Sequence, residues 1–417
     1  MQKKGQSDWK KSYFLIWTGQ AFSLVGSELV QFSLVWYLTE KTGSATVLAL
    51  ASFVALIPRV LLSPFTGALV DRWNRRKIMI FADAGIALAT VLLAGLFLFE
   101  RVTTWHIYAI LFVRSIGSSF HWPAMQASTS LIVPKEHLTK ISGLNQTLRG
   151  AIGIVSPLLS ALLLAALPVF GVLMIDVGTA ALAILPLLFL AIPQPEQPER
   201  TMAGDFRQVL DDVRLGFKYL LNWKGMFYLT LAAMFLNFLL NPGYTFTPLL
   251  VTQFFEKGIL ELSMIETAFS AGMIIGGIIL SLWGGFRRNI DTTIMGIIGL
   301  AGGTVIVAVV PADKFSIAIA GMALTGLMQP IANGPLFAIM QSQVSPEIQG
   351  RIFSLLESMV SAMMPLSMLV AAPVAEWIGI RGWLAFGAGG CFFIGILLYA
   401  IPAVRNIEKE PEVPKPD

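Results

Sequence analysis

The chain contains twelve apolar runs, each long enough to cross a lipid bilayer, which takes about 20 residues of helix. Backbone groups inside a bilayer must hydrogen-bond within the protein, and these runs are too long and too weakly alternating for barrel strands. The sequence therefore predicts an all-α membrane protein with twelve transmembrane helices. The runs lie at about 13–36, 46–70, 78–99, 105–125, 141–167, 169–192, 226–255, 262–285, 290–310, 317–340, 352–378 and 383–404.

Composition agrees with a membrane protein and argues against several other classes. Charged residues make up 13% of the chain, against about a quarter in soluble proteins. The single cysteine, Cys391, excludes an intrachain disulfide and a cysteine-ligated metal, and His106, His121 and His137 are too far apart to indicate a metal site. We find no spacing typical of a nucleophile and its base and no Gly-rich nucleotide loop, so neither an enzyme nor an ATP-driven pump is predicted, and no cofactor is expected.

The basic residues predict the orientation of the helices. Of the 29 Lys and Arg, 21 lie on the side of the two termini and five on the opposite side. The positive-inside rule then places both termini in the cytoplasm. The net charge of +4 is explained by this distribution, so no nucleic-acid partner is expected. The first run has full spanning length and is expected to be retained, not cleaved as a signal peptide.

A polar segment after the sixth run divides the chain. Pro193, Pro195 and Pro198 predict a stiff linker, and apolar residues at helical spacing in 205–221 predict an amphipathic helix on the inner membrane surface. A soluble helix packed on the bundle is the alternative. The predicted organisation is a six-helix bundle in 1–192, a cytoplasmic linker in 193–224, a second six-helix bundle in 225–404 and a cytoplasmic tail in 405–417.

The two halves share a pattern that indicates a duplication. Three features recur at a constant offset of about 212 residues, which is typical of an internal repeat. We therefore predict two pseudo-symmetric bundles of six helices. The matched positions are Arg75–Arg76 with Arg287–Arg288, Pro123 with Pro335, and Pro134 with Pro346.

The stretch "GALVDRWNRRK" joins the second and third runs and concentrates charge between two apolar segments. It resembles the signature that the major facilitator transporters carry between their second and third helices, a superfamily built by duplication of six helices. The positions that carry this resemblance are Gly67, Asp71, Arg72, Arg75, Arg76 and Lys77.

Further stretches are similar to the twelve-span macrolide-efflux branch of the bacterial drug:proton antiporters. They are "YLTEKTGSA", "VRSIGSSFHWPA", "VPKEHLTKISG" and "PEIQGRIFS". The resemblance implies a bacterial cytoplasmic-membrane protein that exports hydrophobic or amphipathic drugs in exchange for protons by alternating access, acting as a monomer among membrane lipids. One departure is "SPLLSA" at Ser156–Ala161, where small residues replace the glycines of the antiporter signature.

Asp71 in the signature stretch is expected to form an inner gate. A carboxylate at the C-terminal end of its own helix meets the negative end of the helix dipole and needs a partner elsewhere. The resemblance implies that this partner is the positive N-terminus of the eleventh helix, near Gly350–Arg351. Arg72 and Arg76 are then expected to bridge neighbouring loops. A loop that only sets topology is the alternative.

Ionisable side chains deep in the membrane are functional candidates because their insertion costs about 2.5–3.5 kcal/mol each. Glu28, Arg114 and Asp83 are predicted to act in proton coupling, with Glu28 and Arg114 as an opposed pair near the midplane. A purely structural salt bridge is the alternative. Asp83, Asp176 and Glu266 are expected nearer the ends of their helices, where snorkelling or capping explains them.

Two further charges, Arg59 and Glu357, fall at comparable depths in the second and eleventh helices. They are predicted to pair between the two halves and to separate during transport. Arg149 occupies the position equivalent to Glu357, and the sequence suggests no partner for it.

The resemblance implies that helices 1, 4, 7 and 10 line a central cavity. Its predicted lining is aromatic and polar, which suits bulky amphipathic compounds better than sugars. A lipid-like or metabolic substrate is the nearest alternative. The residues are Gln31, Phe120, Trp122, Gln126, Arg149, Asn237, Asn241, Tyr244, Gln329 and Asn333.

Overall fold

The computed structural model describes residues 4–134, 137–190, 192, 214, 217–344 and 346–409. Within these ranges the structure is helical, with no strand, so the predicted all-α fold class is confirmed. The side chains of Gly67, Asp71, Arg72, Gly350 and Arg351 lie outside the description. The predicted contact of Asp71 with the start of the eleventh helix therefore also lies outside the described residues.

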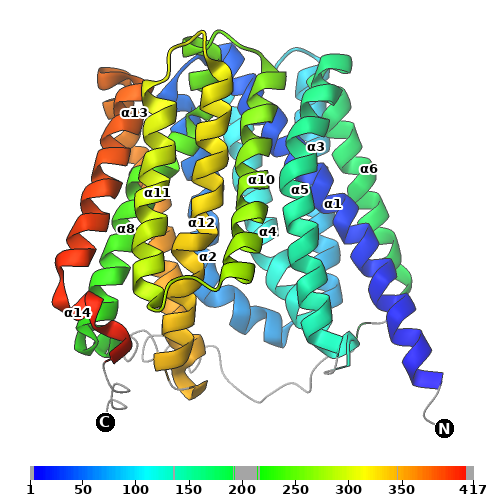
Figure 1. Ribbon diagram of the computed structural model, residues 1–417. Coiled ribbons are helices and arrows are strands. Elements are labelled where there is room, and N and C mark those ends of the chain that lie inside the picture. Colours follow the sequence, from blue (N-terminus) through cyan, green and yellow to red (C-terminus); the bar gives the residue numbers. More distant parts are fainter. Residues whose placement is uncertain are drawn as a thin grey trace. The chain divides into compact units, whose positions relative to one another are not determined.

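Six long helices form the first half of the chain (Figure 1). They follow the six predicted runs, because each run supplies the apolar length that a membrane-spanning helix needs. The helices are α1 (Lys4–Thr42), α2 (Ala45–Arg72), α3 (Arg75–Leu98), α4 (Thr104–Ile132), α5 (Leu138–Ala166) and α6 (Val169–Phe189).

The second half repeats this arrangement with one long broken helix at its end. Its seventh predicted run, 226–255, is not one continuous α-helix, because α8 ends at Thr245 and the chain continues through α9 and a π-helical turn. The elements are α8 (Lys224–Thr245), α9 (Thr247–Leu249), η2 (Leu250–Phe254), α10 (Ile259–Trp283), α11 (Asn289–Val309), α12 (Phe315–Gln343), α13 (Pro346–Ala400), α14 (Pro402–Arg405) and η3 (Ile407–Lys409).

Ten helices in the described part of the chain are long and apolar enough to cross a membrane, and two features account for the difference from twelve. The apolar stretch Leu355–Ala400 has 46 residues, or roughly 69 Å of helix, about twice a bilayer core. It breaks at Gly379, whose φ of 80° is non-helical, between the two runs predicted there. The helix missing from the ten is α4, whose polar residues, including Arg114 and His121, lower its mean hydropathy.

The chain divides into two compact units: residues 1–42 with 54–205, and residues 43–53 with 206–417. The second unit thus includes the start of α2, which hydrogen bonds hold there. Thr46 Oγ1 donates to Glu376 Oε1 (2.6 Å), and Gln253 Nε2 donates to the carbonyl oxygen of Gly43 (2.6 Å).

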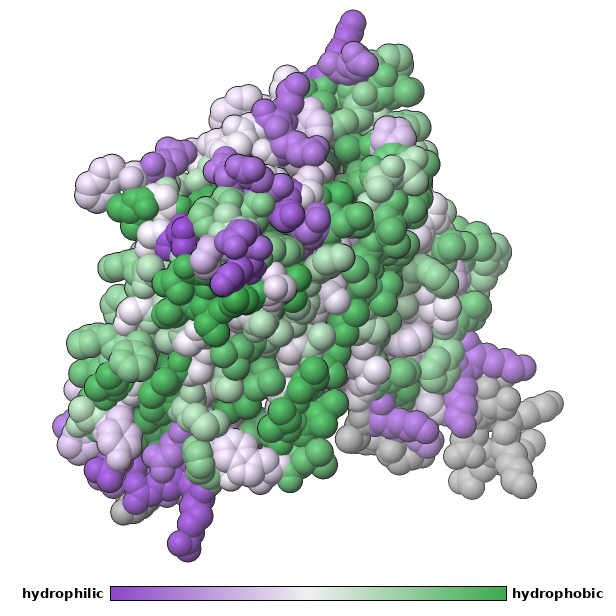
Figure 2. All heavy atoms as spheres, turned by 45° about the horizontal axis from the view of Figure 1, so that its top comes forward, coloured by the Kyte–Doolittle hydropathy of each residue, from purple (hydrophilic) through white to green (hydrophobic). Residues whose placement is uncertain are grey.

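Apolar side chains cover the outside of the helices, as expected for a surface in contact with lipid. Figure 2 shows a broad hydrophobic surface, with hydrophilic residues gathered toward the top and the bottom of the view. Leu282 and Phe189 are exposed by 84% and 81%. Such exposure of large apolar residues indicates a membrane interface.

Glycines on α10 and α12 let these two helices pack at close range. A Cβ added at Gly272, Gly276 or Gly326 would collide with backbone atoms of the facing helix, namely Ala323 O, Leu327 O and Phe269 O. Small residues at such contacts are characteristic of membrane helix packing, where burial of apolar surface provides little driving force.

The described end of the predicted linker helix packs on the second unit. Tyr219, Leu220 and Trp223 are buried in its hydrophobic core, whereas Phe217 and Leu221 are exposed. The placement of the whole linker helix, on the membrane surface or on the bundle, stays a prediction. Most of the predicted amphipathic segment lies outside the described residues.

The C-terminal segment also packs on this unit. Ile407 is fully buried, and Glu408 caps the start of α11 by accepting from Asn289 N (3.1 Å) and Asn289 Nδ2 (2.9 Å). A carboxylate at a helix N-terminus is stabilised by the helix dipole and by the free N–H groups.

Replacing this cap, Glu408→Ala, is expected to destabilise the second unit by about 1 kcal/mol, because α11 loses an anion and two acceptors. The midpoint of thermal unfolding in detergent measures the effect. Asp313→Asn, which removes one carboxylate from an exposed turn, is the control. Equal midpoints for the two variants would show that Glu408 does not stabilise α11.

Candidate functional site

A buried ion pair lies in the interior of the first unit. Arg114 Nη1 on α4 donates to Asp176 Oδ2 on α6 (2.7 Å) and to Thr90 Oγ1 on α3 (2.6 Å). Asp176 is 1% exposed. The prediction that Asp176 snorkels or caps near a helix end is wrong, because α6 begins at Val169 and places Asp176 two turns inside the helix.

The predicted direct pair of Glu28 with Arg114 is not the pair that the structure contains. Arg114 forms its ion pair with Asp176. Glu28 is exposed and interacts with Arg114 only as a more distant charge. A role for Glu28 in proton coupling stays a prediction. Gly26 on α1 permits the arrangement, because a Cβ there would meet Asp176 Oδ1 at 3.0 Å.

A second polar layer lies two helical turns away from the first. Asp83 on α3 is 4% exposed, its Oδ2 accepts from Gln20 Nε2 on α1 (3.1 Å), and its Oδ1 lies 3.3 Å from His121 Nε2 on α4. Asp83 is therefore an interior residue, and the expectation that it snorkels or caps at a helix end is wrong.

The sequence analysis did not assign a role to His121 or Gln20, although a spacing signal is present. Asp83 and Thr90 are seven residues apart on α3, as are Arg114 and His121 on α4. Seven residues are about two turns, or roughly 10 Å, so each helix presents two polar residues on one face. Matching spacings on consecutive helices indicate two polar layers. The structure places Thr90 beside Arg114 in one layer and Asp83 beside His121 in the other.

Beside the second layer, a pocket opens between α1, α4 and α5 of the first unit. It holds about 380 Å³ of empty space, part of it open to solvent. The Arg149 guanidinium lies 3.8 Å from the centre of the Trp122 ring, and Trp17 Nε1 donates to Asn145 Oδ1 (2.8 Å). Trp122, Gln126 and Arg149, three of the predicted cavity residues, line this pocket together with Trp17, Gln20, Ala21, Leu24, Met125, Thr129, Asn145 and Leu148.

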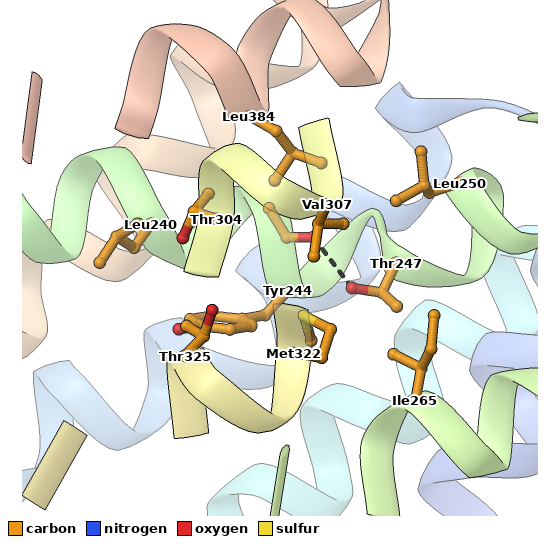
Figure 3. A pocket seen from close by; sticks show the side chains of 11 residues that line it. Leu240, Tyr244, Thr247, Leu250, Ile265, Thr304, Val307, Met322, Thr325 and Leu384 are labelled. Atoms are coloured by element: carbon orange, nitrogen blue, oxygen red, sulfur yellow. Dashed lines mark hydrogen bonds between the residues drawn. The ribbon is translucent and has the colours of Figure 1, made fainter. Parts of the chain in front are cut away.

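The second unit has its own pocket, shown in Figure 3, of about 390 Å³ including space open to solvent. Its lining is mostly apolar, with hydroxyl groups from Tyr244, Thr247, Thr304 and Thr325. In Figure 3 the Tyr244 ring lies beside Thr325 and Met322. Tyr244 is the only predicted cavity residue among those that line it.

The other predicted cavity residues in the second unit are not gathered around this pocket. Asn237 Nδ2 donates to Ala233 O and Asn241 Nδ2 to Asn237 O. Both side-chain amides thus hydrogen-bond to backbone carbonyls of their own helix. Gln329 has a buried Oε1 with no hydrogen-bond partner in the described structure, and Asn333 is exposed.

The remaining predicted residues of the first unit are also dispersed. Gln31 is half-buried on α1, and Phe120 stacks on Trp73 with ring centres 6.3 Å apart. Arg59 is exposed and close enough to Arg149 for their positive charges to interact. Glu357, its predicted partner, is an exposed residue of the second unit, and their pairing stays a prediction.

Two arginines of the predicted inner gate tie together the end of the first unit. Arg75 Nη1 donates to Ala127 O on α4 (2.9 Å), and Arg76 donates to the carbonyl oxygens of Leu187 and Leu188 on α6. Cations at the last carbonyls of a helix are favourable because the helix dipole is negative there. These arginines therefore hold α3 against α4 and α6.

The part of the chain that the structure describes contains no cluster of three or more His, Cys, Asp or Glu residues able to hold a metal ion.

Comparison with known proteins agrees with this architecture. Residues 16–363 match the description of the Major Facilitator Superfamily. The chain belongs to this superfamily. Its fold is similar to that of the nucleoside transporter NupG (TM-score 0.72, 14% identity, covering 93% of this chain and 99% of that one). It is also similar to a bacterial homologue of the iron transporter ferroportin (TM-score 0.71, 13% identity, 96% and 99% covered).

Among curated proteins, the chain is 34% identical to Macrolide efflux protein A of Streptococcus pyogenes over 402 residues, which is 96% of this chain and 98% of that protein. It is 22% identical to the multidrug efflux pump Tap of Mycobacterium tuberculosis (strain ATCC 25618 / H37Rv), covering 96% and 95%. The resemblance to the macrolide-efflux branch is thus confirmed, and this multi-pass membrane protein belongs among transporters.

Proposed function

We propose that this facilitator exports hydrophobic or amphipathic drugs, macrolides among them, from the cytoplasm. The observation that carries the proposal is the identity of 34% to a macrolide efflux protein along nearly the whole of both chains. The chemistry of the first-unit pocket agrees with it, since Trp17 and Trp122 supply aromatic surface and Arg149 and Asn145 supply polar groups of the kind that bind amphipathic molecules.

Export against a gradient requires an energy source, and we assign it to the proton gradient without any cofactor. The support lies in the buried ionisable groups of the first unit, Arg114, Asp176 and Asp83, because charges are placed inside a membrane protein at a considerable free-energy cost. Alternating access would then expose the pocket first to the cytoplasm and then to the outside.

The proposal places the protein in the cytoplasmic membrane of a bacterium with both termini in the cytoplasm, as the positive-inside rule favours. It acts as a monomer surrounded by lipid, on small hydrophobic or amphipathic molecules and without nucleic acid. Lipid-like or metabolic compounds are the competing substrate class.

Susceptibility of an efflux-deficient bacterial host across antibiotic classes tests the function. Expression is expected to raise resistance to macrolides, and purified protein in proteoliposomes is expected to accumulate a labelled macrolide when a pH gradient is imposed. Unchanged susceptibility together with transport of a labelled lysophospholipid would replace the drug by a lipid-like substrate. If macrolide export were the same with and without a pH gradient, proton coupling would be rejected, while drug export would stand.

The variant Trp122→Ala is expected to weaken macrolide binding about tenfold, because the pocket loses an aromatic wall and the Arg149 guanidinium loses the ring beneath it. Binding to purified protein measures the effect. Trp105→Ala is the matched control, since this tryptophan lies on the same helix and is 75% exposed. Equal affinities of the two variants would exclude Trp122 from the binding site.

A further inference from the structure

The two buried acids of the first unit differ in what compensates their charge. Asp176 faces Arg114, whose guanidinium stays protonated at any physiological pH, so this carboxylate has a permanent counter-ion. Asp83 faces a neutral amide and an imidazole. A histidine ring can carry a proton on either or both of its nitrogens. Asp83, which is buried, and His121, whose side chain is 13% exposed, lie 3.3 Å apart and together form a site that can hold a proton.

In the described part of the chain, no Lys or Arg forms an ion pair with Asp83. Of the helices packed against α3, α4 carries Arg114 and α6 carries Asp176, and these two residues neutralise each other. From α1, neutral Gln20 reaches Asp83, while the charge of Glu28 on the same helix interacts with Arg114. From α5, which packs against α1, Arg149 lines the same pocket as Gln20 with its guanidinium over the Trp122 ring, so this cation faces the pair from the pocket side. Loss of the pair's last proton leaves one negative charge on Asp83.

Gln20 connects this pair to the pocket. Its Nε2 donates to Asp83 Oδ2 (3.1 Å), and the same side chain lines the pocket with Trp122 and Arg149. Donation to a carboxylate polarises an amide, which makes its carbonyl oxygen a stronger acceptor. A cationic group in the pocket is therefore stabilised while Asp83 is ionised, and this stabilisation weakens once the pair binds a proton.

We propose that Asp83 and His121 form the proton-binding site of this transporter, and that Gln20 transmits its charge to an amphipathic amine in the adjoining pocket. The proposal rests on proton-coupled drug export and names the site and the chemistry of the substrate. The ammonium group lies toward Gln20, and carbonyl or hydroxyl oxygens of the same molecule accept from Arg149.

Exchange follows from the sign of the charges. Binding of the amine expels one proton from the pair, breaking an O–H bond on Asp83 or an N–H bond on His121, and uptake of a proton later releases the amine. No electron transfer or second reactant is involved. Gln20 is a positioning residue in this scheme, because it acts through Asp83.

Erythromycin, a macrolide with a basic amine, is a suitable probe of the full-length protein in detergent. Between about pH 5.5 and 7.5 its amine stays protonated, as aliphatic amines do. Affinity is expected to rise up to tenfold per pH unit, with about one proton released per molecule bound, as linkage requires. Calorimetry in two buffers of different ionisation enthalpy counts the proton. A neutral macrolide without the amine is expected to bind independently of pH.

The variants separate the pair from other acids. Asp83→Asn is expected to bind erythromycin more weakly and with no pH dependence, and Gln20→Leu is expected to flatten the pH profile while the protein remains folded. His121→Gln shifts the midpoint of the profile. The matched control, His106→Gln at the exposed start of α4, leaves it unchanged.

Three results would overturn the proposal: a full pH slope in Asp83→Asn, a full slope in Gln20→Leu, or equal profiles for the two histidine variants. If Glu28→Gln abolished proton release while Asp83→Asn retained it, Glu28 would be the proton carrier. Proton coupling as a whole would be rejected if the wild-type protein bound erythromycin without releasing a proton and its transport did not respond to a pH gradient. Proton release that persists in Asp83→Asn would defeat only the present assignment.

Discussion

Neutralising one member of the Arg114–Asp176 pair is expected to lower the free energy of unfolding by about 3–5 kcal/mol, because the remaining charge stays buried without its partner. Asp176→Asn leaves the guanidinium facing a neutral amide, and Arg114→Gln leaves a carboxylate that is 1% exposed. Both variants are expected to yield little monodisperse protein in detergent and to unfold at a lower temperature.

The double variant Arg114→Gln with Asp176→Asn is expected to recover most of this loss, since two neutral amides can hydrogen-bond in the same space and no charge remains. Arg101→Gln and Asp313→Asn, which remove one charge each from exposed loops, are the controls. If the single variants matched these controls, or if the double variant were the least stable, the pair would not stabilise the first unit.

The largest packing effect is expected from two adjacent glycines on α10. A Cβ at Gly276 would collide with the carbonyl oxygen of Leu327 and would lie 2.9 Å from Pro330 Cγ, whereas a Cβ at Gly277 has nothing within 4 Å. Gly276→Ala is expected to destabilise the second unit by about 1–3 kcal/mol or more, because α12 must move as a whole to relieve a backbone collision. The bulkier Gly276→Val is expected to give no folded protein.

Gly277→Ala and Gly277→Val are the matched controls, since they make the same changes one residue away. The alanine variant is expected to be neutral or slightly stabilising, because alanine loses less backbone entropy in a helix than glycine. Size-exclusion profiles and thermal midpoints in detergent compare the four variants. Similar profiles at positions 276 and 277 would mean that α10 and α12 do not depend on this close approach.

Much of the fold was predictable because it depends on local properties of the chain. The length of an apolar run determines whether a helix can span the membrane, and the break at Gly379 falls where the sequence places the turn between two runs. The seventh run was less regular than predicted, because α8 gives way to the π-helical turn at Leu250–Phe254. Hydrophobicity alone does not distinguish an α-helical from a π-helical turn.

The site was predictable only in part. Arg114 was predicted from its charge to form a mid-membrane ion pair, and it does so with Asp176. Trp122, Gln126 and Arg149 line one pocket, but this pocket lies between α1, α4 and α5, so the predicted central cavity stays a prediction. The choice of Glu28 as the partner of Arg114 depended on depth in the membrane, which several acids satisfy. Depth in the membrane does not determine the direction in which a side chain points from its helix. Asp176 is the acid that points toward Arg114.

The sequence by itself determined the helical class, the length and number of the spans, and the superfamily, because run length, charge distribution and short motifs are properties of neighbouring residues. Only the tertiary structure decided which polar groups meet: Asp176 with Arg114, and Asp83 with His121 and Gln20. The tertiary structure also showed that Gly276 faces the backbone of α12 whereas Gly277 has open space, a difference that two adjacent glycines do not reveal in the sequence. The physical reason is the same in each case: the energy of a buried charge or a close contact depends on atoms from another helix, far away along the chain.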